Sequence, residues 1–184
     1  MKILVLASAS VLAFAAPAAA QSGFPSNVSY IEQVGNANNA TLLQSTDNAI
    51  SLVAQQGSLE SVQVEQSGAT NYSQISQGVG AGGSSANRAV VLQSGTNGKS
   101  SVQQLGTSNY ANVTFSPGST NAYSLLTQGG TGNSAIISNG DTSNASVVTE
   151  TGDYNKANIF QIGWNNYSVL AQSGYGNVAS VTQK

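Results

Sequence analysis

The sequence predicts an all-β fold, a β-solenoid of seven strand–turn–strand repeats stacked as two facing parallel sheets in a cross-β arrangement. Three observations predict it. A pattern of side chains recurs about every 22 residues, the recurring residues alternate with a period of two, and glycine marks the middle of nearly every repeat. A fixed period in this range is typical of a solenoid, and a period of two is typical of strands.

The residues before the first repeat have the pattern of a secretory signal peptide. Lys2 gives a positive start, an apolar run follows, and small residues precede Gln21, which predicts cleavage after Ala20. A transmembrane anchor is the alternative, but the apolar run is shorter than the roughly 20 residues that a spanning helix needs. We therefore expect a signal peptide at 1–20, a short N-terminal segment at 21–26 and a repeat domain at 27–184.

The first half of each unit carries three recurring positions two residues apart. The units begin near residues 27, 49, 71, 98, 122, 144 and 166. The first position is always serine, namely Ser29, Ser51, Ser73, Ser100, Ser124, Ser146 and Ser168. The second is aliphatic, namely Ile31, Val53, Ile75, Val102, Leu126, Val148 and Leu170. The third is glutamine with one exception, namely Gln33, Gln55, Gln77, Gln104, Gln128, Glu150 and Gln172.

The second half follows a turn that carries Gly35, Gly57, Val79, Gly106, Gly130, Gly152 and Gly174. It opens with Asn38, Glu60, Asn87, Asn109, Asn133, Asn155 and Asn177. Small or β-branched residues come next, at Ala40, Val62, Ala89, Ala111, Ala135, Ala157 and Ala179, followed by Leu42, Val64, Val91, Val113, Ile137, Ile159 and Val181. The half closes with Gln44, Gln66, Gln93, Phe115, Asn139, Gln161 and Gln183.

Side chains two apart on a strand share one face, so all of these positions are expected to point into a common interior between the two strands. The aliphatic residues would form its dry part. Buried amides without partners would cost on the order of 1–3 kcal/mol each, whereas an amide that meets its copy one repeat away both donates and accepts a hydrogen bond. Stacking in register is therefore the arrangement that makes these buried polar positions tolerable.

These amides are the predicted assembly residues. Gln33, Asn38 and Gln44 at one end, and Gln172, Asn177 and Gln183 at the other, would continue the ladder between copies of the chain. The full predicted stacking ladder is Gln33, Asn38, Gln44, Gln55, Gln77, Gln104, Asn109, Gln128, Asn133, Asn155, Gln161, Gln172, Asn177 and Gln183. The alternative is that they only stabilise the repeats of one chain.

Two longer units fit the same scheme, because "GVGAGGSSA" at 78–86 and "SPGST" at 116–120 are rich in turn residues. We expect both to be surface loops that lengthen a turn and leave the strands unchanged. We also expect Trp164, in the link between units six and seven, to pack on that edge of the stack.

The composition argues against an enzyme and against several kinds of partner. The chain has 19 Asn and 16 Gln, which would ordinarily indicate low complexity and disorder, but the regular spacing argues against that. It contains no Cys and no His, so the commonest metal ligands and general base are missing, and we expect no catalytic residue, no metal and no cofactor. The net charge of −2 and the lack of a basic cluster indicate no nucleic-acid partner and no membrane insertion.

The unit Ser-x-(Ile/Val/Leu)-x-Gln-x-Gly-x-x-Asn-x-Ala-x-(Val/Ile)-x-Gln resembles the curlin repeat, over about residues 27–183 in seven copies. Curlins are subunits of curli, the amyloid fibres on bacterial surfaces. The resemblance implies a strand–turn–strand solenoid, export across the outer membrane by a secretion apparatus, and assembly with itself, or with a second curlin subunit, into extracellular biofilm matrix. Glu60, Val79, Phe115 and Glu150 depart from the pattern, and an inward carboxylate in an amide column must be protonated or paired.

Three functions are compatible with this reading. The first is a structural subunit that adds head to tail, because both end units keep the full pattern and an uncapped repeat offers unpaired backbone groups as a template. The second is a minor nucleator that templates another curlin. The third is a capped, monomeric solenoid adhesin or a carbohydrate-cleaving enzyme, for which Glu150 and Asp153 form the one near pair of carboxylates in a turn region.

Overall fold

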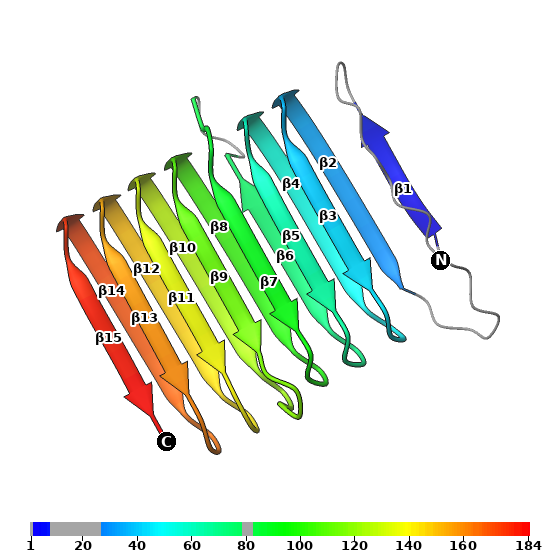
Figure 1. Cartoon of the computed structure of the whole chain (residues 1–184), viewed down its shortest axis with the longest axis vertical. Helices are drawn as coiled ribbons and strands as arrows, with labels where there is room; N and C mark the ends of the chain where they lie inside the picture. Colours follow the sequence, from blue (N-terminus) through cyan, green and yellow to red (C-terminus); the bar gives the residue numbers. More distant parts are fainter. Residues whose placement is uncertain (1, 8–26, 79–82) are drawn as a thin grey trace.

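The chain folds into two parallel β-sheets that lie face to face. The structure is a computed structural model that describes residues 2–7, 27–78 and 83–184, and within these ranges it contains strands and no helix. Strands from successive repeats lie side by side in chain order (Figure 1), so the predicted β-solenoid of seven strand–turn–strand repeats is confirmed.

The first sheet has the order β1-β2-β4-β6-β8-β10-β12-β14. Its strands are β1 (Lys2–Ala7), β2 (Val28–Asn36), β4 (Ile50–Ser58), β6 (Tyr72–Gln77), β8 (Lys99–Thr107), β10 (Tyr123–Thr131), β12 (Ala145–Asp153) and β14 (Tyr167–Tyr175). The second sheet has the order β15-β13-β11-β9-β7-β5-β3. Its strands are β3 (Asn39–Gln44), β5 (Ser61–Gln66), β7 (Arg88–Gln93), β9 (Tyr110–Phe115), β11 (Ser134–Asn139), β13 (Lys156–Gln161) and β15 (Val178–Gln183).

One strand from each sheet makes a rung, and seven rungs form the stack, from β2 with β3 to β14 with β15. Every rung is in register with the next, so that like positions meet: Ser29 pairs with Ser51 and Gln33 with Gln55, and the same holds at the other end for Gln161 with Gln183. This register brings each predicted column into a continuous line. A slip of one residue would turn the interior outward, so the alternating pattern fixes the register.

The interior is thin and close-packed. The aliphatic columns of both sheets form one buried cluster, which includes Val53, Ile75, Leu126, Ile137 and Ile159. At the two ends of the stack the same columns are only half-buried, at Ile31 and Leu42 on one side and Val181 on the other. The apolar interior therefore runs the length of the stack and opens at its end rungs.

The predicted signal peptide lies largely outside the described residues. Of it, the structure describes Lys2–Ala7, which forms β1 and pairs in parallel with β2 from Val28 to Gln33. The N-terminal segment 21–26 is also outside the described ranges, and both assignments stay predictions.

The two long turns leave the strands in register, as the sequence predicts. Gln77 pairs with Gln104 and Gln66 with Gln93 on either side of the first loop, of which residues 79–82, including the predicted Val79, lie outside the described ranges. Ser85 bridges to Ser58 and Thr107, which returns the chain to the stack before β7 begins.

Both turns of each repeat use a left-handed residue at a fixed place. In the turn that leads into the second strand, the residue before the asparagine column has a positive φ in every rung, for example Ala37 at 55° and Tyr154 at 58°. The other turn repeats this at Asn48, Thr70, Asn97, Asn121, Ser143 and Asn165. The N–H of Thr70 donates to the Asp47 carbonyl of the preceding rung at 3.2 Å. The left-handed conformation thus continues the backbone hydrogen bonding through the turns.

Glycine is required at the turn column because the turns stack closely. At Gly106, φ is +105° and a Cβ atom would lie 2.2 Å from the Gly130 carbonyl oxygen. A side chain at this position would therefore separate two rungs and break the register of both sheets.

The replacement Thr70→Asn should stabilise the fold by about 1 kcal/mol, because a β-branched residue is strained at positive φ and asparagine tolerates it. The reverse change at the equivalent position, Asn48→Thr, should destabilise it by a similar amount. Guanidinium chloride denaturation of both variants beside the parent measures this. Equal midpoints for all three chains would contradict the assignment of strain to this turn position.

Candidate functional site

The first glutamine column forms a continuous side-chain ladder through six rungs. The column comprises Gln33, Gln55, Gln77, Gln104, Gln128, Glu150 and Gln172. The Nε2 of Gln33 donates to Gln55 Oε1 at 2.6 Å, and each following glutamine donates to the next at 2.9, 2.8 and 2.9 Å. Gln128 then donates to Glu150 Oε2 at 2.7 Å. The amide nitrogen and the amide oxygen of each interior glutamine are therefore both hydrogen-bonded along the column.

The amide nitrogen also donates to the backbone of the opposite sheet in Gln55, Gln77, Gln104 and Gln128. Gln55 Nε2 donates to the Asn39 carbonyl at 3.1 Å, and Gln77 Nε2 donates to the Ser61 carbonyl at 3.2 Å. These bonds tie a strand of one sheet to the beginning of the opposite strand in the preceding rung. The column thus holds the two sheets together as well as the rungs.

The closing column is a ladder in two pieces. It comprises Gln44, Gln66, Gln93, Phe115, Asn139, Gln161 and Gln183. Gln44 donates to Gln66 at 2.9 Å and Gln66 donates to Gln93 at 2.7 Å. On the other side of the interruption, Gln161 donates to Gln183 at 2.7 Å. Between these pieces stand Phe115 and the shorter Asn139.

The serine column supports the closing column from the facing sheet. Ser51 Oγ donates to Gln66 Oε1 at 2.9 Å, and Ser168 Oγ donates to Gln183 Oε1 at 2.6 Å. The hydroxyl of Ser100, in the rung of Phe115, and that of Ser73, in the preceding rung, are buried without a partner. The phenyl ring therefore interrupts both the glutamine ladder and the serine bonds that accompany it.

Phe115 fits because the facing position has no side chain. Phe115 is fully buried, and a Cβ atom on Gly98 would lie 2.6 Å from its Cδ2 atom. The same position is occupied by Ala49 and Ala122 in other units, so the backbone there accepts a side chain. Gly98 and Phe115 therefore form a size-matched pair.

The asparagine column differs from the predicted amide-to-amide ladder. The column comprises Asn38, Glu60, Asn87, Asn109, Asn133, Asn155 and Asn177. Asn109 Oδ1 accepts the backbone N–H of Asn133 at 3.0 Å, and Asn109 Nδ2 donates to the Gly130 carbonyl at 2.9 Å. Amide-to-amide bonds occur within this column at Asn155 with Asn133 and at Asn177 with Asn155. Its main partner is the turn backbone of the next rung, because the shorter side chain lies beside the turn.

A second asparagine column, which the sequence reasoning missed, lies at the other turn. Asn27, Asn71, Asn144 and Asn166 occupy it, and the remaining units have Ala or Gly there. Asn27 Oδ1 accepts the N–H of Ala49 at 2.9 Å, and Asn144 Oδ1 accepts the N–H of Asn166 at 3.0 Å. These positions are the first residues of the predicted units, and the recurrence of asparagine there was the signal in the sequence that could have revealed the column.

Glu60 is accommodated in the asparagine column by three donors. Its Oε2 accepts the N–H of Asn87 at 2.9 Å, and its Oε1 accepts from Ser84 Oγ at 2.8 Å and from Asn87 Nδ2 at 3.2 Å. Burial raises the pKa of this carboxyl, and the hydrogen bonds from Ser84 and Asn87 oppose the rise. Ser84 belongs to the loop at 78–86, so the longer loop supplies one donor that the longer side chain uses.

The two end rungs present interior chemistry to the outside. Within the described residues, β14, β15 and β3 have no strand on their outer sides. Asn177 is exposed, Gln44 and Gln183 are half-buried, and Gln33, Asn38 and Gln172 are buried at the margin. The structure thus places the predicted end residues in two rows, one at each end of the stack, and the remaining predicted residues inside it.

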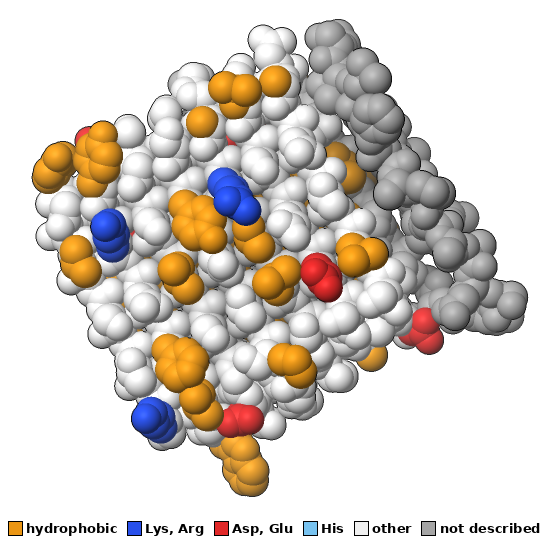
Figure 2. All heavy atoms as spheres, in the orientation of Figure 1, with side chains coloured by type: hydrophobic (Ala, Val, Ile, Leu, Met, Phe, Trp, Pro, Cys, Tyr) orange, Lys and Arg blue, Asp and Glu red, His pale blue; other side chains and the backbone are white. Residues whose placement is uncertain are grey.

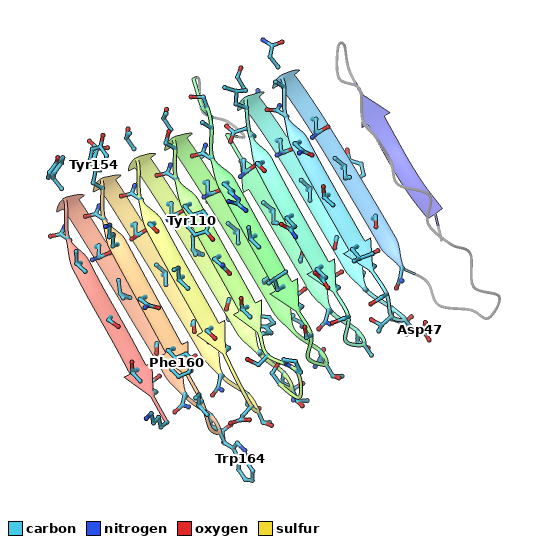
Figure 3. All side chains as sticks on the ribbon, viewed as in Figure 1. Asp47, Tyr110, Tyr154, Phe160 and Trp164 are labelled. Atoms are coloured by element: carbon cyan, nitrogen blue, oxygen red, sulfur yellow. The ribbon has the colours of Figure 1, made fainter. Side chains whose placement is uncertain are left out.

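The broad faces carry no comparable pattern. Figure 2 shows apolar side chains scattered among polar ones over one sheet face. The prediction for Trp164 is wrong: it is 77% exposed and extends from the turn instead of packing on the edge (Figure 3). The chain turns at Gly163 before the indole can reach the stack. At the opposite turn, the rings of Tyr154 and Tyr175 pack edge to face, with their centroids 5.5 Å apart.

Charged side chains do not gather into a reactive site in the parts of the chain that the structure describes. No group of three or more acidic, His or Cys side chains suitable for a metal ion occurs there, and no described helix could cross a membrane. Glu150 is buried in the glutamine column, whereas Asp153 accepts the N–H of Thr131 at the turn at 2.8 Å. The two carboxylates have different partners.

Comparison with known families agrees with the repeat chemistry. A family model described as the curlin associated repeat matches residues 152–184, which span the end of β12 through β15. This part of the chain is similar to the curlin repeat. No curated protein matches the chain. The predicted resemblance to the curlin family is thereby confirmed over these residues, and the repeat and the solenoid together fit a structural fibre subunit of the curli type.

Replacing Gln104 by leucine should cost about 2–4 kcal/mol, because it leaves the Gln77 amide and the Gln128 carbonyl oxygen buried without their partners. Its neighbour Gln103 is exposed, so Gln103→Leu changes composition identically and should cost less than about 0.5 kcal/mol. Denaturant unfolding of the two variants gives the comparison. A similar loss in both would mean that the ladder contributes nothing beyond the side chain's volume.

Gly98→Ala should destabilise the parent by about 1–3 kcal/mol through overpacking against Phe115. In a Phe115→Gln background the same change should cost little, because the ring that it meets is gone. A double-mutant cycle on unfolding free energies measures this coupling. Additive effects of the two changes would show that the ring and Gly98 are not matched.

Proposed function

We propose that this chain is an exported structural subunit that joins copies of itself head to tail into an extracellular fibre. One observation carries the proposal: the end rungs repeat the backbone register and the polar columns of the interior, while β3, β14 and β15 have no strand on their outer sides within the described residues. The outer side of β2 carries only β1, which belongs to the predicted signal peptide. An open parallel edge in a repetitive stack is a template for one more rung.

The two ends are chemically complementary. The glutamine–glutamine bonds of the two glutamine columns run from the Nε2 of one rung to the Oε1 of the rung that follows it, from Gln33 to Gln55 through to Gln161 and Gln183. The C-terminal rung, β14 with β15, therefore offers donors from Gln172 and Gln183. The N-terminal rung, β2 with β3, offers acceptor oxygens on Gln33 and Gln44. Joining the C-terminal rung of one copy to the N-terminal rung of the next continues both ladders.

The asparagine columns extend the same join. Asn177 Oδ1 stands where Asn155 Oδ1 accepts the N–H of the following rung at 3.0 Å, so it would accept the N–H of Asn38 in the next copy. The half-buried Ile31, Leu42 and Val181 would be covered by this contact. A contact between two different surfaces does not close on itself and generates a fibre.

Export and location complete the proposal. The signal peptide predicted at 1–20 would direct the chain out of the cytoplasm, and cleavage after Ala20 would remove β1 together with it, leaving the edge of β2 open. The proposed partners are copies of this chain, a second curlin subunit and an outer-membrane secretion apparatus. The proposed role is biofilm matrix and surface adhesion, as in the curli fibres that the repeat resembles.

The assembly test blocks one edge of the stack without changing its interior. The Asn166 carbonyl accepts the N–H of Ala145 in the preceding rung at 2.8 Å. Backbone groups alternate along a strand, so Ser168 bonds toward β12 and Val169 aims its N–H at the free edge. Proline at Val169 removes this donor and places its ring where an incoming strand must lie.

Purified Val169→Pro chain should form no fibres alone, and small amounts should stop parent growth at one fibre end only, seen by two-colour fluorescence microscopy on seeds. Val169→Thr, which keeps the donor and the shape, should grow like the parent. Growth of the proline variant at the parental rate would refute assembly through this edge. If the parent instead triggers another curlin without entering the bulk fibre, the chain is a nucleator.

A further inference from the structure

Two buried oxygen atoms without hydrogen-bond partners meet at one step of the first glutamine column. Glu150 Oε1 and Gln172 Oε1 are both buried and unpaired. Glu150 and Gln172 are direct partners in the register of β12 and β14, so the two side chains occupy successive positions of one column. Both atoms are acceptors, so the side-chain ladder stops between the sixth rung and the seventh.

The chemistry of the substituted residue explains the stop. A glutamine at position 150 would accept from Gln128 with its oxygen and donate to Gln172 with its nitrogen, as Gln104 does between Gln77 and Gln128. A carboxylate accepts only, and a carboxylic acid has one hydroxyl donor. With a proton on Oε1, Glu150 has the same acceptor and donor along the column as a glutamine, although it lacks the second N–H that Gln128 donates to the Tyr110 carbonyl.

We propose that Glu150 is a structural proton-binding site, whose bound proton donates to Gln172 Oε1 and couples the C-terminal rung to the rest of the stack. The inference rests on the proposed function in one respect: if subunits add to this rung, the proton also regulates the fibre end. In its neutral form Glu150 continues the ladder through all seven rungs. In its ionised form it faces an acceptor oxygen across a dry interface.

The other inward carboxylate has more hydrogen-bond donors around it. Glu60 receives three hydrogen bonds, from Ser84 and from two nitrogen atoms of Asn87. Glu150 receives one, from Gln128 at 2.7 Å. A buried charge with a single donor is costly, whereas a neutral acid with one acceptor above it is satisfied. The two positions therefore differ in how many donors an ionised carboxylate would meet.

No charged neighbour compensates an ionised Glu150 within the described residues. Gln128 on β10 and Gln172 on β14 flank it in the column, and β11 and β15 carry no charged side chain. On its own strand Asp153 bonds to Thr131, and Lys156 at the start of β13 is exposed. The tyrosines of the flanking strands, Tyr123, Tyr167 and Tyr175, are exposed and lie outside the interior.

Burial raises the pKa of the Glu150 carboxyl, and the hydrogen bond from Gln128 opposes this with a smaller effect. Because the pKa is raised in the folded stack, the undocked state loses its proton first as pH increases. The stabilisation from the proton is thus fully present below about pH 4.5, the ordinary value, and is lost as pH rises through the raised pKa. Acid should strengthen the attachment of the C-terminal rung.

The first measurement titrates the carboxyl directly. In protein with ¹³C-labelled glutamate, the Glu150 carboxyl signal is identified by its loss in Glu150→Gln. We expect the Glu150 midpoint above about pH 4.5, the ordinary value of a glutamate side chain. A midpoint at or below that value overturns the inference.

The second measurement reports on the seventh rung. Protection of the β14 amides against hydrogen exchange, corrected for intrinsic rates, should increase between pH 8 and pH 4 by about tenfold for each unit by which the pKa is raised. Glu150→Gln should show high protection at both pH values, and the exposed control Glu65→Gln should follow the parent. The same pH response in Glu150→Gln and the parent would overturn the proton's role.

Both measurements apply to the folded chain whether or not it assembles, so their failure is separate from failure of the fibre proposal. On fibres, seeded growth of the parent relative to Glu150→Gln should increase from pH 8 to pH 4. A ratio that does not change with pH, on fibres that do grow, would overturn the regulation of the fibre end while leaving assembly intact.

Discussion

Everything in this fold depends on the stacking of a buried polar side chain on the equivalent position one rung away. An isolated rung would bury amides without hydrogen-bond partners. The cost of about 1–3 kcal/mol per unpaired group would exceed the stabilisation from burying the few aliphatic side chains of that rung. Stacked rungs satisfy these groups, as the unbroken series from Gln33 to Gln128 demonstrates. Register, turn geometry and the glycine column at Gly106 all serve to keep the equivalent positions aligned.

Three of the positions that depart from the pattern, Glu60, Phe115 and Glu150, have a local compensation, and the three compensations differ in kind. Glu60 is longer than asparagine and receives a donor from Ser84 in an extended loop. Phe115 is bulkier than glutamine and lies against Gly98. Glu150 has the same shape as glutamine but no N–H donor, and a proton on Oε1 supplies the donor along the column. Substitutions in a stacked column are therefore tolerated when shape, donors or protonation are matched elsewhere in the same or the adjacent rung.

The sequence was sufficient for the fold and for which residues face inward, because a period of two repeated seven times leaves one arrangement of faces. It was insufficient to predict the hydrogen-bond and packing partners of those residues. Asn109 bonds to the turn backbone of the next rung. This choice of partner depends on the distance between the side chain and the turn, which the spacing of residues in the sequence does not reveal. The column of Asn27, Asn71, Asn144 and Asn166 was missed because three of its seven positions lack a polar side chain. The pairing of Gly98 with Phe115 joins opposite sheets, so no local pattern reveals it.

The uniform direction of the glutamine bonds has an electrical consequence. Backbone dipoles in a sheet alternate and largely cancel, but every side-chain amide from Gln33 to Gln128 is aligned the same way along the stack. Their moments add from rung to rung, and in a head-to-tail fibre they would add from copy to copy. Such a fibre would be a polar rod with distinguishable ends, and neighbouring rods would attract one another most strongly side by side in opposite orientations.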